Sequence, residues 1–389
     1  MNIKHILRSI RIRLFHKRNP NIWVFGAWMG NSYNDNPKEL FEYVSNNCPN
    51  IHAYWVTKSN VVFDYLKNKG FKVELFGSKN YFTLLENAGL FIYNIYNADI
   101  VDAKFSYYIR DAAVLHTSHG MPIKKAYLDT PNVKKPSKLS LLKKELLIFL
   151  GLKGKQYNIC TSDFFKPITY SQFMNKRILV EGTPRLDILF SKKESSYIKN
   201  LKSMFPKGVR FILYMPTFRS AIDDGVPFSP FSQFGFDMRQ MDEMLQRNNM
   251  VFLNKAHFYD NNIDDGFHSD RFITIENSPT LDIYDILKDV DILATDYSSI
   301  YTDFALINKP IILTPFDYSD YIKNYRELYF DYKLWASKVV YNWTDFISAI
   351  DKSDYWSLPE DRVALFHKYR DGKTSERLVK TMSRILKIK

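Results

Sequence analysis

Residues 296–299 have the sequence Asp-Tyr-Ser-Ser, which places two hydroxyls in a turn suited to binding a phosphate. The apolar run before them, 291–295, predicts a buried strand, and residues 299–307 predict a helix that leads to a second strand at 311–314. The turn of such a strand–helix–strand unit precedes a helix N-terminus, where unpaired N–H groups and the helix dipole favour an anion. Serine at a helix start also acts as a simple cap, so the local sequence allows both interpretations.

Other polar residues follow the ends of predicted strands in the same way. In open α/β sheets, ligands bind outside the carboxyl ends of the strands, and two such sheets facing one another would direct these residues at one cleft. Several of the predicted helices start near a lysine or arginine, and this pattern predicts a binding site for a polyphosphate that does not use a glycine-rich loop. The candidate residues are Ser118, His119, Arg185, Thr217, Arg219, His257, Asp296, Ser298 and Ser299.

The elements that would position these residues follow a regular alternation. Strand-length apolar runs separated by helical stretches extend over residues 22–180, and a second series begins at 211 after a lysine- and serine-rich break. This pattern predicts an α/β protein with two Rossmann-like, doubly wound domains that face a central cleft. We expect the domains to span residues 21–190 and 191–365, and residues 366–389 to form a C-terminal helix that can cross back to the first domain.

Composition excludes several classes of protein. Hydrophobic residues make up 46% of the chain, enough to fill two cores, so disorder is not expected. The two cysteines, Cys48 and Cys160, form no metal-binding or CxxC pattern, which fits a reducing cytoplasm. No histidine pair has the spacing of metal ligands, so we expect no protein-held metal or other cofactor, with Mg²⁺ left open.

The net charge of +12 is concentrated in two segments. Residues 1–20 carry six basic residues and no acidic one, and residues 119–157 carry nine lysines against two acids. The longest apolar run, 146–152, is far shorter than the roughly 20 residues of a spanning helix. Residues 1–20 and 131–155 instead have the spacing of basic amphipathic helices, which lie on an anionic membrane or pack on the protein surface. The cations predicted to contact the membrane are Arg8, Arg11, Arg13, Lys17, Arg18, Lys143 and Lys144.

Seven motifs follow one another in an order that resembles a known family. The sequence resembles the CDP-glycerol:poly(glycerophosphate) glycerophosphotransferases, the alditol-phosphate transferases of teichoic acid and capsule polymer synthesis, from about Gly30 to Arg377. The motifs lie at residues 119–125 (HGMPIKK), 182–187 (GTPRLD), 214–219 (YMPTFR), 255–257 (KAH), 295–312 (from TDYSS to KPII), 329–332 (YFDY) and 371–377 (DGKTSER).

The resemblance implies a GT-B enzyme at the cytoplasmic face of the cell membrane. Its N-terminal domain would bind a lipid-linked or glycan acceptor and its C-terminal domain a CDP-alditol, such as CDP-glycerol or CDP-ribitol. An acceptor hydroxyl attacks the phosphorus that bears the polyol, and CMP leaves. Such a reaction needs a base for the hydroxyl proton and positive charge or donors for the phosphates.

The resemblance also implies roles for individual residues. His119 is expected to be the general base, and His257 to serve the donor phosphate or leaving group. Asp303 is expected to hold a polyol hydroxyl, or to be a first-turn carboxylate stabilised by the helix dipole. The residues expected to bind the CDP pyrophosphate are Arg185, Thr217, Arg219, Lys255, Asp296, Ser298 and Ser299.

Two departures from the family pattern leave the polyol and the acceptor open. Ser118 stands where a tryptophan usually precedes the His-Gly pair, and no Pro-Gly-Pro follows residues 329–332. Three other functions remain as alternatives. They are a GT-B glycosyltransferase that uses a nucleotide sugar, a nucleic-acid-binding protein with its pI of about 9.3, and a catalytically inactive membrane adaptor.

Overall fold

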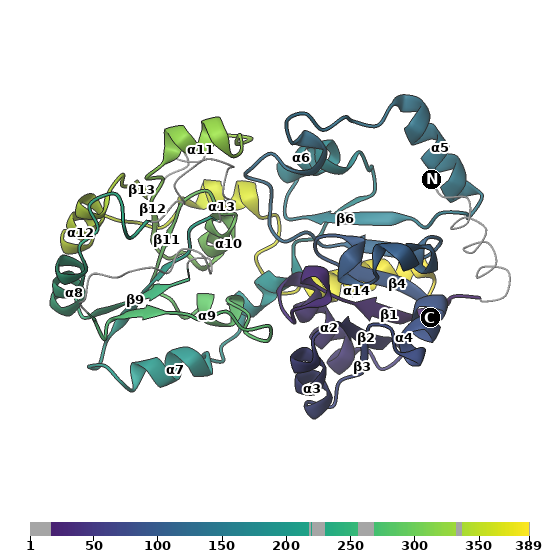
Figure 1. Cartoon of the computed structure of the whole chain (residues 1–389), viewed down its shortest axis with the longest axis horizontal. Helices are drawn as coiled ribbons and strands as arrows, with labels where there is room; N and C mark the ends of the chain where they lie inside the picture. Colours follow the sequence, from purple (N-terminus) through teal and green to yellow (C-terminus); the bar gives the residue numbers. More distant parts are fainter. Residues whose placement is uncertain (1–16, 218, 220–229, 256–267, 332–336, 389) are drawn as a thin grey trace.

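The computed structural model describes residues 17–217, 219, 230–255, 268–331 and 337–388. It contains two α/β domains that lie side by side, the N-terminal one on the right in Figure 1 and the C-terminal one on the left. Each domain is built on a sheet in which every paired strand is parallel to its neighbour. The predicted α/β fold with two alternating series of strands and helices is therefore confirmed.

The N-terminal domain contains a seven-stranded sheet in the order β3-β2-β1-β4-β5-β6-β7. Its strands are β1 (Asn19–Phe25), β2 (His52–Thr57), β3 (Val73–Leu75), β4 (Ala88–Tyr93), β5 (Ala113–His116), β6 (Gln156–Cys160) and β7 (Ile178–Val180). Its helices are α2 (Asp35–Asn47), α3 (Asn60–Asn68), α4 (Lys79–Asn87), α5 (Lys138–Phe149) and α6 (Phe165–Phe173), with short 3₁₀ turns that include η1 (Trp28–Gly30) and η5 (Pro184–Phe190).

The C-terminal domain contains a six-stranded sheet in the order β10-β9-β8-β11-β12-β13. Its strands are β8 (Arg210–Tyr214), β9 (Met250–Asn254), β10 (Phe272–Thr274), β11 (Ile292–Thr295), β12 (Ile311–Leu313) and β13 (Lys338–Val339). Its helices are α7 (Ser196–Lys202), α8 (Met238–Arg247), α9 (Tyr284–Leu287), α10 (Ile300–Phe304), α11 (Tyr318–Asn324), α12 (Trp343–Asp351) and α13 (Glu360–Phe366).

The apolar runs of the sequence form the central strands of these sheets. Every residue of β4 and of β9 is buried, because helices cover both faces of a parallel sheet. Residues that follow the carboxyl ends of β5, β8, β9 and β11 line the space between the two domains. The helix predicted over 299–307 forms as α10 followed by the 3₁₀ turn η7 (Ala305–Ile307), and Asn308 in the left-handed conformation ends it.

The last helix, α14 (Thr374–Leu386), leaves the C-terminal domain and packs on the N-terminal one. It runs beside α2 in Figure 1, and Leu378, Val379 and Met382 belong to the same buried cluster as Trp23 and Phe41. The chain therefore crosses the domain boundary twice, once between β7 and β8 and once before α14.

Arg18 does not belong to a membrane-facing surface, and that prediction is wrong. Its guanidinium lies 2.5 Å from the carboxylate of Asp111 and donates to the backbone oxygens of Leu85 and Ala88 at 3.0 and 2.9 Å. These contacts occupy the donors that a lipid headgroup would need. Lys17 is exposed, whereas Arg8, Arg11 and Arg13 lie outside the described residues.

Helix α5 lies at the edge of the N-terminal domain, away from the C-terminal domain (Figure 1). Its side chains at Leu139, Leu142, Leu146 and Phe149 are 76, 68, 55 and 86% exposed, and their spacing places them along one face. None of the helices in the described part of the chain is long and apolar enough to cross a bilayer.

Candidate active site

A cleft of about 1280 Å³ separates the two domains and receives residues from both. From the N-terminal domain it is lined by Trp28, His119, Lys124 and Tyr127, among others. Of the predicted site residues, His119, Arg185, Thr217, Lys255, Ser298 and Ser299 line this one cleft. These residues follow different strands that lie far apart in the sequence, so it is the fold that brings them together.

The C-terminal side of the cleft is formed where β8 and β11 run next to each other. Their adjacency brings the turn after Tyr214 beside the turn that carries Ser298 and Ser299. The hydroxyl of Ser298 accepts from the Ile300 amide at a long distance of 3.5 Å, and Ser299 makes no side-chain cap. The capping interpretation therefore does not account for Ser299. Because α10 spans only Ile300–Phe304, the serine hydroxyls matter more here than the helix dipole.

The loop after β5 forms part of the N-terminal side of the cleft. Ser118 adopts a φ of 58°, and the loop then brings Gly120 directly against the start of α10. A Cβ atom on Gly120 would lie 2.1 Å from the hydroxyl oxygen of Ser299, so only glycine allows this approach. The imidazole of His119 is exposed to the cleft and packs edge-to-face with Trp28, with ring centroids 5.9 Å apart.

The surroundings of His119 favour the neutral form of its imidazole. The protein around the ring displaces water from it and lowers its pKa below the ordinary value, and the positive charges of Arg185, Lys124 and Arg326 act in the same direction. The carboxylate of Asp35 opposes them. A neutral imidazole has a lone pair that can accept a proton, which a general base requires.

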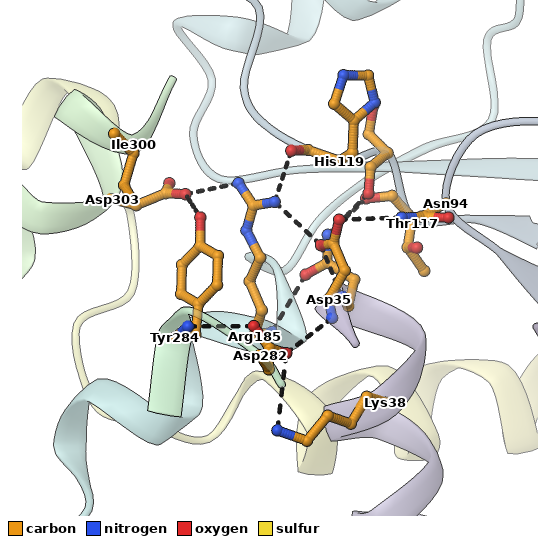
Figure 2. A network of polar contacts seen from close by, with 12 residues as sticks. Asp35, Lys38, Asn94, Thr117, His119, Arg185, Asp282, Tyr284, Ile300 and Asp303 are labelled. Carbon is orange, nitrogen blue, oxygen red and sulfur yellow. Dashed lines mark hydrogen bonds and ion pairs between the residues drawn. The ribbon is translucent and has the colours of Figure 1, made fainter. Parts of the chain in front are cut away.

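Arg185 lies deeper than its predicted role as a pyrophosphate ligand requires, and its side chain is 3% exposed. Figure 2 shows its polar contacts. One terminal nitrogen donates to Asp35 Oδ1 at 2.9 Å and to the backbone oxygen of His119 at 2.5 Å. The other donates to Asp303 Oδ2 at 2.6 Å. Both ends of the guanidinium fork are therefore engaged by protein atoms.

Asp303 is fully buried and does not line the cleft, so its predicted role as a polyol ligand is wrong for this arrangement. Its Oδ2 accepts from Arg185 and from the hydroxyl of Tyr284, both at 2.6 Å. Asp303 lies in the first turn of α10, and its ion-pair partner is an arginine from the other domain.

Arg219 and Asp296 bind each other behind the cleft surface, which corrects their predicted contact with the donor. The guanidinium lies 2.5 Å from Asp296 and 2.7 Å from Asp317, and its side chain is 2% exposed. Asp296 also accepts from the Thr217 amide at 2.7 Å. This buried cluster supports the Thr217 turn. His257, the second predicted catalytic histidine, lies outside the described residues.

Lys124 is a cleft residue that the predicted site did not include. Its ammonium group crosses the cleft to within 3.3 Å of the Thr217 hydroxyl, and burial lowers its pKa to about 8. A backbone bridge between Lys124 and Leu328 of the other domain holds it there. Its place in the HGMPIKK motif is the sequence signal that could have identified it.

Lys255 lines the same cleft as a second cation. Its ammonium group donates to Asn277 Oδ1 at 2.5 Å, and burial lowers its pKa. Asp35 was likewise absent from the predicted site, although the polar stretch after the first strand, 30–37, contains it. Among the residues that the structure describes, no cluster of histidine, cysteine and carboxylate side chains could hold a metal ion.

Comparisons with known proteins agree with this geometry. Residues 8–384 match the family model of CDP-glycerol:poly(glycerophosphate) glycerophosphotransferases. The chain is 28% identical over 410 residues to a teichoic acid glycerol-phosphate transferase of Staphylococcus aureus, covering 98% of this chain and 97% of the relative. It is 34% identical over 218 residues to the teichoic acid ribitol-phosphate polymerase TarL of the same species, which covers 53% of this chain. The chain spans only 37% of the length of that polymerase.

The fold also has a counterpart among solved structures. A structure of the wall teichoic acid polymerase TagF superimposes with a TM-score of 0.70 at 21% identity, over 99% of this chain and 98% of that one. This likeness confirms the GT-B arrangement. Since the family model covers nearly the whole chain, the protein is a member of the CDP-glycerol:poly(glycerophosphate) glycerophosphotransferase family.

Proposed function

We propose that this enzyme transfers an alditol phosphate from a CDP-alditol, glycerol or ribitol being the candidate polyols, to a hydroxyl of a membrane-linked or glycan acceptor. CMP is released, and the product phosphodiester belongs to a teichoic acid or capsule polymer. One observation carries the proposal. His119 from one domain and Ser298, Ser299 and Lys124 line a single cleft, so that a base and a set of phosphate-binding groups face the same space.

In the proposed phosphotransfer, each side of the cleft has its own role. The neutral imidazole of His119 takes the proton of the acceptor hydroxyl while that oxygen attacks the phosphorus that bears the polyol. The bond from this phosphorus to the bridging oxygen breaks, and the electron pair leaves with CMP. The negative charge of a bound diphosphate raises the pKa of the nearby imidazole, which makes it a stronger base when the donor is in place.

The donor diphosphate is assigned to the serine turn and the cleft lysines. Ser298 and Ser299 supply hydroxyl donors, and Lys124 and Lys255 supply point charges for the transferring and leaving oxygens. Arg219 and Asp296 support this turn from behind, and Arg185 supports the His119 loop. His257 remains a predicted ligand of the leaving phosphate.

The exposed face of α5 is proposed to contact an anionic membrane. Its four large apolar side chains would enter the headgroup region, while Lys138, Lys143 and Lys144 would contact lipid phosphates. This placement would bring the acceptor side of the enzyme to a lipid-linked substrate at the cytoplasmic face.

A panel of donors tests the proposal. The purified enzyme is incubated with CDP-glycerol, CDP-ribitol and UDP-sugars, with a lipid-linked acceptor present, and nucleotide release is measured. CMP from a CDP-alditol supports the proposal, and the His119→Ala variant should lose about 10²- to 10⁴-fold in turnover. Release of UDP or UMP without any CMP would instead identify a nucleotide-sugar glycosyltransferase.

A further inference from the structure

We infer that Arg185 is a positioning residue for His119. Its guanidinium binds one carboxylate from each domain together with the backbone oxygen of His119, so the proposed base is oriented when the two domains are closed. The inference rests on the proposed role of His119 and adds a coupling between domain closure and catalysis. It replaces the predicted role of Arg185 as a pyrophosphate ligand.

The geometry of Arg185 is that of a three-way bridge (Figure 2). Its terminal nitrogens contact Asp35, the His119 backbone oxygen and Asp303 at 2.9, 2.5 and 2.6 Å. The planar guanidinium lies over the ring of Tyr284, with 4.6 Å between its central carbon and the ring centroid. A planar fork of donors is needed to reach three acceptors in different directions at once.

The two counter-charges come from opposite domains. Asp35 begins α2 of the N-terminal domain, where it adopts a φ of 64°, and its other oxygen accepts from Asn94 at 2.9 Å. Asp303 belongs to α10 of the C-terminal domain. Arg185 itself lies in η5, the turn that precedes the crossing to the second domain. If the domains separated, Arg185 would lose Asp303 and its guanidinium would no longer be held in the orientation that reaches His119.

Neighbouring contacts tie the same loop to the domain boundary. Asn36 donates to the backbone oxygen of Ser118 at 2.8 Å and accepts from the Arg185 amide at 3.1 Å. The amide of Asp35 donates to Asp282 of the C-terminal domain at 2.8 Å. Asn36, at the start of α2, therefore holds the backbone of Ser118, and the Arg185 side chain holds the backbone of His119. The positions of these two residues determine the direction of the imidazole.

The first test separates positioning from ligand binding. Arg185→Lys keeps the positive charge but loses the planar fork, so we expect kcat with the CDP-alditol to fall about 100-fold, the effect of a small misplacement of a reacting group. Asp303→Asn should lower kcat in the same direction. For both variants the KM and the Kd for the donor should change by less than about threefold, and thermal unfolding will verify that each is folded.

A matched control is available in another ion pair that joins the domains. Lys125 and Glu327 also contact each other across the boundary, but this pair lies at the surface, where the two side chains are 36 and 53% exposed. Glu327→Gln should leave kcat unchanged. If Arg185 binds the diphosphate instead, Arg185→Lys will weaken donor binding tenfold or more with little change in kcat, and the inference is then overturned.

The second test does not depend on turnover. The titration of the His119 ring is followed by NMR in histidine-labelled protein, with the resonance assigned by its absence in His119→Ala. The charged groups facing the ring are Asp35, Arg185, Lys124 and Arg326. Arg185→Gln removes one positive charge, so the midpoint should rise, whereas Arg185→Lys should displace the ring resonance with a smaller change in midpoint.

The outcomes distinguish the two proposals. If the wild-type enzyme releases no CMP from CDP-glycerol or CDP-ribitol while the Arg185 variants still alter the His119 resonance, the proposed function fails and the positioning role is supported. If the wild-type enzyme releases CMP and the Arg185→Lys and Arg185→Gln variants change neither kcat nor the His119 resonance, the positioning role is refuted.

Discussion

Gly120 of the N-terminal domain lies against Ser299 of the C-terminal domain so closely that a methyl group on Gly120 would come within 2.1 Å of the serine oxygen. This contact places the loop of the proposed base directly beside the proposed phosphate site. The closed cleft therefore depends on the absence of a side chain at one position.

Gly120→Ala should push the two domains apart at this contact. Overpacking of this kind costs about 1–3 kcal/mol, so we expect a lower melting temperature together with loss of activity. The double variant Gly120→Ala with Ser299→Gly removes the atoms that clash and should regain most of the lost stability. Calorimetry of both variants measures this, and equal stability of the single variant and the wild type would show that the loop simply moves aside.

Removal of the serine hydroxyls should weaken donor binding. Hydrogen bonds to charged groups contribute about 1.5–3 kcal/mol each, so Ser298→Ala or Ser299→Ala should raise the Kd of a CDP-alditol by about 10- to 100-fold. Isothermal titration calorimetry measures the Kd directly. Ser203→Ala, at an exposed serine after α7, is the control and should have no effect. An unchanged Kd in both site variants would place the diphosphate elsewhere.

Lys124 should make donor binding sensitive to alkaline pH. Burial lowers its pKa to about 8, so in the free enzyme the ammonium group loses its proton as pH rises through that value, and with it the charge that attracts phosphate. We expect the Kd for the donor to be constant near pH 7 and to increase above pH 8. In Lys124→Gln, binding should be weaker at pH 7 and no longer show that increase.

The neighbouring lysine provides the control for this pH profile. Lys125 is paired with Glu327 at the surface, so Lys125→Gln should retain the wild-type dependence on pH. A profile that is the same in the wild type and Lys124→Gln would exclude the Lys124 ammonium as a donor ligand.

His116 should make the fold less stable in mild acid. Its side chain is 2% exposed, and burial lowers its pKa from 6.5 to about 4. As pH falls, His116 is therefore protonated in the unfolded chain before it is protonated in the folded protein. The contribution of neutral His116 to the free energy of unfolding is complete above pH 6.5 and is lost towards pH 4. The linkage amounts to about 2 kcal/mol at pH 5.

Chemical denaturation at pH 7 and pH 5 measures this loss. The His116→Gln variant should show a smaller difference between the two pH values than the wild type. His52→Gln, which replaces an exposed histidine on β2, should retain the wild-type difference. A wild-type stability that is equal at both pH values would show that His116 is protonated within the fold.

The exposed face of α5 should determine binding to anionic vesicles. Replacing Leu142 and Phe149 by serine removes two of the largest exposed apolar side chains without disturbing the buried Ile148. We expect sedimentation with vesicles containing phosphatidylglycerol to fall at least tenfold, with donor binding unchanged. Replacing Met204, which is 70% exposed on the other domain, by serine is the control. Equal sedimentation of the α5 variant and the wild type would contradict membrane contact by this helix.

The basic N-terminal segment requires a truncation that ends before Arg18. Since Arg18 is bonded to Asp111 and to backbone oxygens, deleting it would damage the fold and confuse a membrane assay. Deletion of residues 2–16 should reduce vesicle binding while leaving the melting temperature within a few degrees of that of the full chain.

Both sheets could be predicted from the sequence because parallel strands buried on two faces appear as short apolar runs. The position of polar residues at strand ends was also sufficient to predict that His119, Thr217, Ser298 and Ser299 line one cleft. Both signals are local, since each depends on a few neighbouring residues, and the topology of an α/β sheet then determines where the strand ends meet.

The pairing of charged side chains could not be predicted in this way. Arg219 binds Asp317, and Arg185 binds Asp35 and Asp303, across 98, 150 and 118 residues of sequence. Nothing in the sequence around an arginine shows whether its guanidinium faces a ligand or a distant carboxylate. For the same reason, the motif that contains Lys124 and Lys125 does not show which of the two ammonium groups faces the cleft.

The path of α14 has a consequence for how the protein is made. The hydrophobic core around Trp23 and Phe41 includes Leu378, Val379 and Met382, which leave the ribosome after the strands of both sheets. The N-terminal domain therefore cannot complete its core until α14 has emerged. The domain that emerges second has all its strands outside the ribosome before the first can finish folding.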